Sequence, residues 1–299
     1  MIVRPKPNLL NLLISLKGSI ARRIAVRSLM ITLLASLIVL VGTLHPDWFV
    51  RVEATPFTLL GLSLSIFMSF RNNACYDRWW EGRKAWGRVI FEIRSFTRQC
   101  VAIGNDAVRE KLLHEICGFA HALNARLRDE DEFAAANQWV SGLPGGAGHN
   151  ASDAILQRIG RQCTQLARRG EISEWRAISL EERLNGLAEA QATCERIKST
   201  PLPFPYTLLL HRTIYIFCIL LPFAMAVPLG WVAPIFTTVV SYTFFGLDAI
   251  GDELENPFGR DENDLPTDAI VRTIEREILS TLGHEELPPV LEPVDFVLS

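Results

Sequence analysis

Apolar runs without a single charged residue alternate along the chain with long polar stretches. Two such runs span residues 28–44 and 54–70, and a third extends from Thr213 to Leu247. A helix needs about 20 residues to cross about 30 Å of hydrocarbon, which the first two runs approach. Buried helices of soluble proteins usually keep a polar face, and these runs barely have one. The pattern therefore predicts helices that cross a membrane.

The third run is too long for one crossing. Pro228, Gly230 and Pro234 lie inside it and predict a turn, because proline cannot continue a helix and glycine favours a turn. We therefore divide this run into helices near 206–227 and 232–250. Together with the first two runs, this predicts four transmembrane helices.

Basic residues set the orientation of these helices. The loop at residues 45–53 contains only Arg51, whereas six basic residues precede the first crossing: Arg4, Lys6, Lys17, Arg22, Arg23 and Arg27. Because basic residues concentrate on the cytoplasmic side, both termini and the 71–200 segment are expected in the cytoplasm. We expect no cleavable signal peptide, since the first apolar run is long and starts late.

The polar stretch between the second and third crossings has helical periodicity. Apolar residues recur three and four positions apart from Arg83 to Arg128, and again over 151–172 and 178–199. Residues 141–150 (SGLPGGAGHN) are rich in glycine and predict a flexible surface loop. We expect a helical cytoplasmic bundle.

The second crossing ends without a turn signal. No glycine or proline lies between Gly61 and Gly82, so one helix is expected to run through Phe70 and on into 71–83. The tryptophans Trp79, Trp80 and Trp86 follow. Either they form an aromatic belt at the membrane interface, or they pack against other cytoplasmic helices, which we favour because of the large area that they would bury.

The domain boundaries follow from these elements. We assign a basic N-terminal segment, transmembrane helices 1 and 2, a cytoplasmic helical domain, transmembrane helices 3 and 4, and an acidic C-terminal segment, over residues 1–27, 28–70, 71–203, 204–250 and 251–299.

Composition agrees with a chain divided between lipid and water. Of 299 residues, 49% are hydrophobic and 21% are charged, which is too apolar for an ordinary soluble enzyme. The six cysteines form no CxxC pair and are read as reduced thiols. His114 and Cys117 are three residues apart and could contribute to a zinc site, although packing is the commoner role of such a pair.

Motifs that carry enzymatic chemistry are missing from the sequence. It contains no GxSxG, P-loop, HExxH or GxGxxG after a strand. We therefore expect no enzyme activity, no cofactor and no nucleic-acid partner.

Three features could carry function without chemistry. Leu62, Ile66 and Phe70 are four residues apart and share one helix face, which ordinary packing also explains. The acidic stretch 251–268 could bind a hard cation, or it could be a solvated tail that breaks the helix. Arg212, beside His211, is either a functional charge inside a crossing or an interfacial anchor.

The order of these elements resembles the bestrophin family, and most closely its bacterial branch. The run 71-RNNACYDRWWEGRKAWG-87 directly after 62-LSLSIFMSF-70, and 256-NPFG-259 followed by an acidic run, carry this resemblance over approximately Pro5–Asp268. It implies a homopentamer in the bacterial inner membrane with one axial pore that conducts monovalent ions.

The resemblance also implies roles for particular residues. Leu62, Ile66 and Phe70 would form a hydrophobic neck on the second transmembrane helix, and Ile178 a second, cytoplasmic aperture, with Leu180 as the alternative register. Apolar rings can gate a pore by dewetting. The Trp and Arg residues of 71–87 would lock neighbouring helices and subunits.

Two points stay open. Asn256, Asp261 and Asp264 match the calcium clasp of animal members, but Glu253 replaces an amide and Arg260 and Asn263 interrupt the acidic run, so we commit to no metal site. The family includes anion and cation channels, and apolar rings do not select by charge sign; the bacterial-type signature slightly favours cations.

A membrane-anchored helical sensor or scaffold without a conducting pore is the alternative function. In that case the spans would only hold the cytoplasmic bundle in place, and changes at Leu62, Ile66 or Phe70 would affect nothing but stability.

Overall fold

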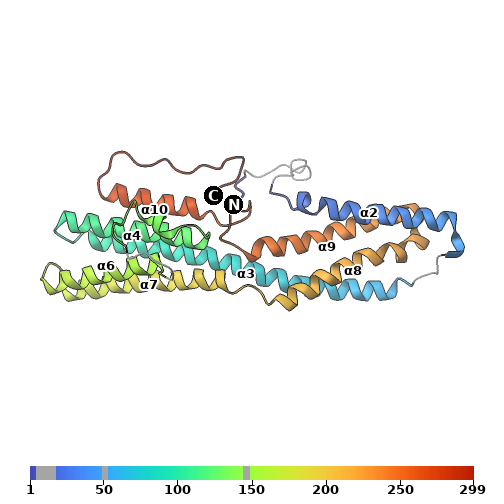
Figure 1. Ribbon diagram of the computed structural model, residues 1–299, viewed down its shortest axis with the longest axis horizontal. Helices are drawn as coiled ribbons and strands as arrows, with labels where there is room; N and C mark the ends of the chain where they lie inside the picture. The colour runs from blue at the N-terminus through green and yellow to red at the C-terminus, as the bar shows by residue number, and fades with distance from the viewer. Residues whose placement is uncertain (5–17, 49–52, 144–148) are drawn as a thin grey trace. The chain divides into compact units, whose positions relative to one another are not determined.

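The computed structural model describes residues 1–4, 18–48, 53–143 and 149–299. These residues form helices joined by short connections, as Figure 1 shows, and they contain isolated β-bridges but no β-sheet. The prediction of an all-helical chain is confirmed. The predicted loop at 141–150 falls partly outside the described residues, and its described flanks, 141–143 and 149–150, are not helical.

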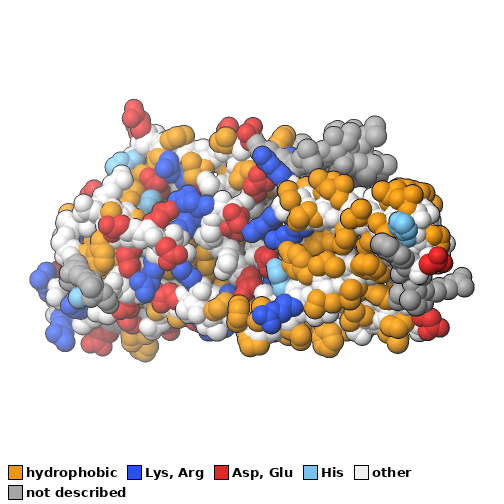
Figure 2. All heavy atoms as spheres, turned by 45° about the vertical axis from the view of Figure 1, so that its right-hand side comes forward, with side chains coloured by type: hydrophobic (Ala, Val, Ile, Leu, Met, Phe, Trp, Pro, Cys, Tyr) orange, Lys and Arg blue, Asp and Glu red, His pale blue; other side chains and the backbone are white. Residues whose placement is uncertain are grey.

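The chain divides into two compact units, which we name by their surfaces. The apolar unit comprises residues 5–79 and 201–255, and the polar unit comprises residues 1–4, 80–200 and 256–299. Hydrophobic side chains gather over the helices of the apolar unit in Figure 2, whereas charged side chains are dense over the rest of that face.

Four helices build the apolar unit: α2 (Ala21–Leu44), the first part of α3 (Thr55–Cys100), α8 (Phe204–Leu229) and α9 (Ala233–Glu255). A short 3-10 helix, η2 (Gly230–Val232), joins α8 to α9 at the predicted turn. Helix α8 passes through Pro222, which lies inside the helix predicted near 206–227.

Helix α3 is continuous over 46 residues. It therefore passes through Phe70 and Arg71 without interruption, which confirms that the apolar run ends in polar sequence and not in a turn. The absence of glycine and proline between Gly61 and Gly82 explains this, because neither a flexible residue nor a missing N–H group interrupts the hydrogen-bond ladder.

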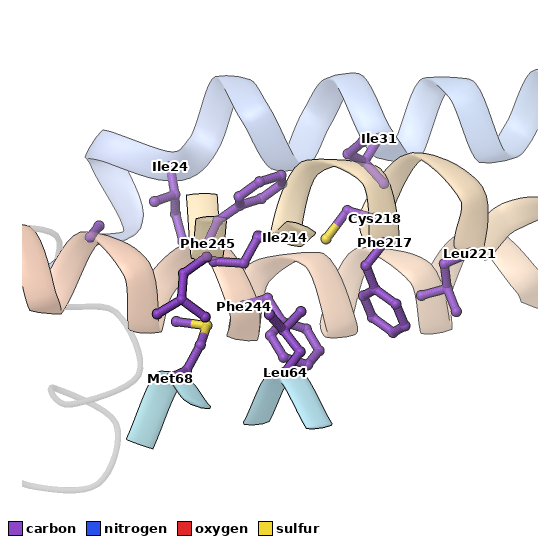
Figure 3. Packing of buried hydrophobic residues seen from close by; sticks show 12 residues of the cluster. Ile24, Ile31, Leu64, Met68, Ile214, Phe217, Cys218, Leu221, Phe244 and Phe245 are labelled. Atoms are coloured by element: carbon purple, nitrogen blue, oxygen red, sulfur yellow. The ribbon is translucent and has the colours of Figure 1, made fainter. Parts of the chain in front are cut away.

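The core of the apolar unit takes side chains from all four helices. Phe217 of α8 meets Phe244 of α9 edge to face, with ring centroids 5.2 Å apart. Leu64 and Met68 of α3 point into the same cluster, as Figure 3 shows. A Cβ at Gly61 would lie 3.2 Å from the Phe217 ring, so a glycine here lets α3 approach α8 closely.

Two stretches of the described residues are long and apolar enough to cross a membrane. They are Ala21–Leu44 and the 52-residue stretch Phe204–Glu255, which includes α8, η2 and α9. The crossing predicted at 54–70 forms the first part of α3 and is not one of these two stretches. Four crossings therefore stay a prediction.

The polar unit contains the rest of α3 and five further helices: α4 (Asp106–Leu127), α5 (Glu132–Ala136), α6 (Ala151–Arg168), α7 (Glu174–Ser199) and α10 (Thr267–Thr281). Side-chain caps begin several of them: the Asn105 side chain accepts from Val108 N, and the Ser173 side chain accepts from Arg176 N. Helix α7 therefore begins four residues before the predicted position 178.

One sequence expectation for this unit was wrong. The helical pattern from Arg83 to Arg128 is divided by a break at residues 101–105, where Gly104 and the cap residue Asn105 end one helix and start the next.

The acidic stretch 251–268 is helical only at its two ends. Helix α9 continues to Glu255, and residues 256–266 are not helical, in agreement with the reading of a segment that breaks the helix. The chain then forms α10, an amphipathic helix with Ile274 and Ile278 buried, so this part of the C-terminal segment is folded.

Candidate functional site

The candidate pore residues lie on the outward face of α3. The exposed fractions of Leu62, Ile66 and Phe70 are 60%, 48% and 61%, whereas Leu64 and Met68 between them are buried. Three large apolar side chains therefore point away from the chain's own core. Such a contiguous exposed apolar face indicates a contact with lipid or with another protein surface.

Several contacts fix the backbone of α3 beneath this face. The Tyr206 hydroxyl of α8 donates a hydrogen bond to the Phe67 carbonyl at 3.0 Å. The Asn72 amide donates to the Leu247 carbonyl of α9 at 3.0 Å. The outward residues are thus carried on a helix that is tied to α8 and α9.

Arg71, immediately after Phe70, is a buried cation. Its guanidinium donates to the Asp248 carboxylate at 3.0 Å and to the Asp248 carbonyl at 3.3 Å, and it also pairs with Asp252. A buried charge is tolerated only when it is paired and hydrogen-bonded. We name Arg71, Asp248 and Asp252 the arginine latch, since they join α3 to α9.

The sequence analysis missed this latch. Its signal was present, because Asp248 and Asp252 are four residues apart at the end of an apolar helix and therefore share a face. A carboxylate at that depth requires a cationic partner.

His211 and Arg212 are adjacent in sequence but lie in different environments. His211 Nδ1 lies 3.1 Å from the Asp248 carboxylate, beside the latch, and is half-buried. Arg212 is exposed. The exposed position of Arg212 matches the anchor reading, whereas His211 is the one of the two that contacts an acidic group.

The aromatic residues that follow Phe70 on α3 differ in their exposure. Trp86 is fully buried, Trp79 is half-buried, and Trp80 and Tyr76 remain 46% and 50% exposed. The expectation that these residues pack within the chain is confirmed for Trp86 and is wrong for Trp80. Tyr76 and Trp79 stack with centroids 6.4 Å apart on consecutive turns of α3.

The Asn-Pro-Phe-Gly element forms part of the polar unit's core. Phe258 is buried, and its ring would lie 3.1 Å from a Cβ placed on Gly82. Leu265 N donates to the Pro257 carbonyl at 2.9 Å, which closes the loop. The motif therefore packs the chain after α9 onto α3.

The loop that follows contains the candidate metal residues. Asp264 is buried and its carboxylate accepts a hydrogen bond from Asp261 N at 2.8 Å, while the Asn256 and Asp261 side chains are exposed. No group of three or more His, Cys, Asp or Glu side chains arranged to hold a metal occurs in the described part of the chain. Asp264 therefore stabilises the loop between α9 and α10 by accepting a hydrogen bond from the loop's own backbone.

Arg260, which interrupts the acidic run, forms ion pairs with two carboxylates. Its Nε donates to Glu130 at 2.9 Å, and its guanidinium also lies 3.3 Å from Asp268. Burial alone would raise the pKa of Asp268, yet hydrogen bonds from Asn124 and Arg128 and the charge of Arg260 lower it.

The candidate aperture residue lies on α7. Ile178 is 55% exposed, whereas the alternative Leu180 is fully buried.

The six cysteines are all buried and free, and burial raises the pKa of the Cys163 and Cys194 thiols to about 12. Thiols of that kind are poor nucleophiles and poor metal ligands.

Comparison with known proteins gives the family of this chain. Residues 1–280 match the model of the bacterial and fungal bestrophin proteins. A voltage-dependent anion channel-forming protein of Mesorhizobium japonicum is 41% identical over 99% of this chain and 96% of its own length. The voltage-dependent anion channel-forming protein YneE of Escherichia coli strain K12 is 37% identical over 98% of each chain.

Solved structures agree with this match. The crystal structure of a bacterial bestrophin homologue from Klebsiella pneumoniae is 33% identical, covers 88% of this chain and 100% of that chain, and has a TM-score of 0.83. The helical architecture, the exposed apolar face of α3 and the packed Asn-Pro-Phe-Gly element thus occur in a chain that belongs to the bacterial and fungal bestrophin family.

Proposed function

We propose that this protein is a homopentameric ion channel that passes monovalent ions through one axial pore. The observation that carries this proposal is the exposed apolar face of Leu62, Ile66 and Phe70 on a helix whose opposite face is packed. Membership of the bestrophin family and the names of the anion channel-forming relatives support it.

The channel lies in a lipid bilayer, the bacterial inner membrane. Its four crossings are α2, the first part of α3, α8 and α9, which correspond to the assigned segments 28–70 and 204–250. The exposed apolar side chains of these helices, among them Leu33, Ile216 and Val239, support contact with lipid. Segments 1–27, 71–203 and 251–299 lie in the cytoplasm, with both termini.

Five copies of Leu62, Ile66 and Phe70 form three apolar rings, the hydrophobic neck. An ion in such a ring loses water without gaining a polar partner, so a narrow neck closes by dewetting and opens when it widens by a small amount. The hydrogen bonds and the latch that tie α3 to α8 and α9 support a neck whose width depends on how these helices pack.

Ile178 forms a second constriction in the cytoplasmic part of the pore. Its exposure supports this register, because Leu180, two residues on, is already committed to the chain's own core. A ring of Ile178 side chains would restrict ion size in the same way as the neck.

The competing function is a membrane-anchored sensor or scaffold that does not conduct. Its exposed α3 face would then serve only packing between helices or subunits. The two functions differ in one measurement, since only the channel predicts that trimming the neck changes an ion current.

The test is the current across a planar bilayer that contains purified protein, compared between wild type and Ile66→Ala. Removing three carbon atoms from each of the five Ile66 side chains widens the neck and lowers the dehydration barrier, so the current should increase by about tenfold or more, which corresponds to about 1.4 kcal/mol of barrier. The control is Ile216→Ala, which makes the same change on an exposed face of α8.

The channel predicts an unchanged current for Ile216→Ala. If wild type, Ile66→Ala and Ile216→Ala all carry no current although flotation with liposomes verifies their insertion, the channel would be contradicted and the scaffold favoured. An equal rise in both variants would contradict the assignment of the neck to α3.

A further inference from the structure

The exposed face of α3 that carries the neck continues past Phe70. Asn73 and Asp77 follow Phe70 at intervals of three and four residues and therefore share its face. Both are exposed. We call this row of exposed residues on α3, Leu62, Ile66, Phe70, Asn73 and Asp77, the stripe. It changes from apolar to polar at Asn73, and its first formal charge is the carboxylate of Asp77.

Asp77 differs from the other acidic residues at this end of the apolar unit. Asp248 and Asp252 pair with Arg71, and Glu253 lies 3.3 Å from Arg23. Among the described residues, no ion pair or hydrogen bond involves the Asp77 carboxylate. Its charge is therefore not neutralised by any residue in the described part of the chain.

The arginines nearest to Asp77 in sequence are directed elsewhere. Arg71 is buried in the latch, and Arg78 donates from Nε to the Glu255 carbonyl at 3.2 Å. On the stripe, the next cation is Lys84. At 1.5 Å per residue, Asp77 lies about 10 Å beyond Phe70 along the helix and Lys84 about 21 Å beyond it.

This difference decides which charge acts on the end of the neck. The Debye length is about 8 Å at physiological ionic strength, so a charge about 10 Å away is screened much less than one about 21 Å away. An apolar ring discriminates by dehydration and not by sign. The sign preference must therefore come from charges beside it.

We propose that Asp77 is the residue that sets the charge preference of this channel, in favour of cations. The inference rests on the proposed function: in a pentamer, five carboxylates ring the end of the neck, concentrate monovalent cations there and exclude anions. Asn73, between neck and carboxylate, supplies an uncharged polar surface where an ion leaving the apolar rings regains hydrogen-bonding partners.

The test is the reversal potential under a KCl gradient, which yields the ratio of cation to anion permeability. The ratio should exceed one in wild type and in Asp77→Glu, fall by about threefold to tenfold in Asp77→Asn, and fall below one in Asp77→Lys, because charged clefts raise local counter-ion concentrations by about tenfold or more. Asp106→Asn is the matched control, since this exposed aspartate lies on α4.

Salt separates a field effect from a change of shape. The difference between wild type and Asp77→Asn should shrink from 0.1 M to 1 M salt, since the Debye length falls from about 10 Å to about 3 Å. Each variant is also measured in combination with the second substitution Ile66→Ala, because this substitution is expected to raise the current.

The outcomes are distinguishable. No current in any variant, including Ile66→Ala, overturns the proposed channel and this inference with it. Current with the same permeability ratio in wild type, Asp77→Asn and Asp77→Lys overturns the inference alone, as does an anion preference in wild type or an equal shift in Asp106→Asn.

Discussion

A buried cation in the apolar unit and a buried carboxylate in the polar unit are stabilised differently. In the apolar unit the buried group is the Arg71 guanidinium, held by Asp248 and Asp252. In the polar unit it is the Glu92 carboxylate, held by Arg88 at 2.6 Å and Arg183 at 3.1 Å.

The partners differ in their access to water. Of the two partners of Arg71, the Asp248 side chain is 1% exposed and the Asp252 side chain 34%, whereas the Arg88 and Arg183 side chains are 50% and 23% exposed. If one partner of the Glu92 centre is lost, water can solvate what remains. At Arg71 the Asp248 carboxylate has almost no access to water, so loss of the guanidinium leaves a buried negative charge that water cannot solvate.

The largest effect is therefore expected for Arg71→Met. It leaves Asp248 buried without its cation, and breaking a buried pair in this way costs about 3 to 5 kcal/mol. We expect a sharp fall in the midpoint of thermal unfolding in detergent, followed by tryptophan fluorescence, and loss of the assembled oligomer in size-exclusion chromatography.

The double variant Arg71→Met with Asp248→Asn tests the reason for this loss. It removes the stranded carboxylate charge and should recover part of the lost stability, because replacing both charges of a buried pair costs less than removing one. A midpoint for Arg71→Met equal to that of wild type would show that the latch does not stabilise the apolar unit.

A smaller effect is expected for Glu92→Gln. The amide keeps the shape of the side chain, and the two arginines turn to water, so the cost is the lost charge-assisted hydrogen bonds, about 2 kcal/mol. Gly186 on α7 shows how closely this carboxylate is packed, since a Cβ there would lie 2.5 Å from it. A thermal midpoint lower than that of Arg71→Met would contradict the ranking of the two centres.

Sequence reasoning identified local features of the molecule well. The continuity of α3 and the turn at η2 depend on residues close together in the chain, namely the positions of glycine and proline. The outward position of Leu62, Ile66 and Phe70 likewise follows from helix periodicity.

Long-range partners were not predictable in the same way. Arg71 and Asp248 are 177 residues apart, and a hydrophobic pattern carries no information on which charges meet. The same holds for Arg260, whose partner Glu130 lies on a distant segment. Asp77 could be recognised as uncompensated only once the partners of Arg71 and Arg78 were known.

The smallest effect concerns the pH dependence of stability. The Arg71 guanidinium keeps its charge at any ordinary pH, whereas the polar unit contains a largely buried histidine that can gain a proton. His121 stacks on Trp139 with ring centroids 5.5 Å apart and lies near Glu275. Burial, assisted by the charge of Arg272, lowers the pKa of His121 from 6.5 to about 4. Between these values the unfolded chain binds more protons than the folded chain, so stability falls as the pH is lowered through this window.

His121→Phe keeps the stack and removes the titration. The wild type should therefore lose about 1 to 2 kcal/mol more than this variant between pH 6.5 and pH 4, less than the full pKa shift implies because part of the ring is solvated. Burial raises the pKa of Glu115 and Glu275, which gives the opposite slope in both proteins and cancels in the comparison. The readout is the thermal midpoint at each pH in detergent. Parallel pH profiles of wild type and His121→Phe would mean that His121 gains a proton as readily in the folded protein as in the unfolded chain. The polar unit would then accommodate a protonated His121 against Trp139, in addition to its buried carboxylates.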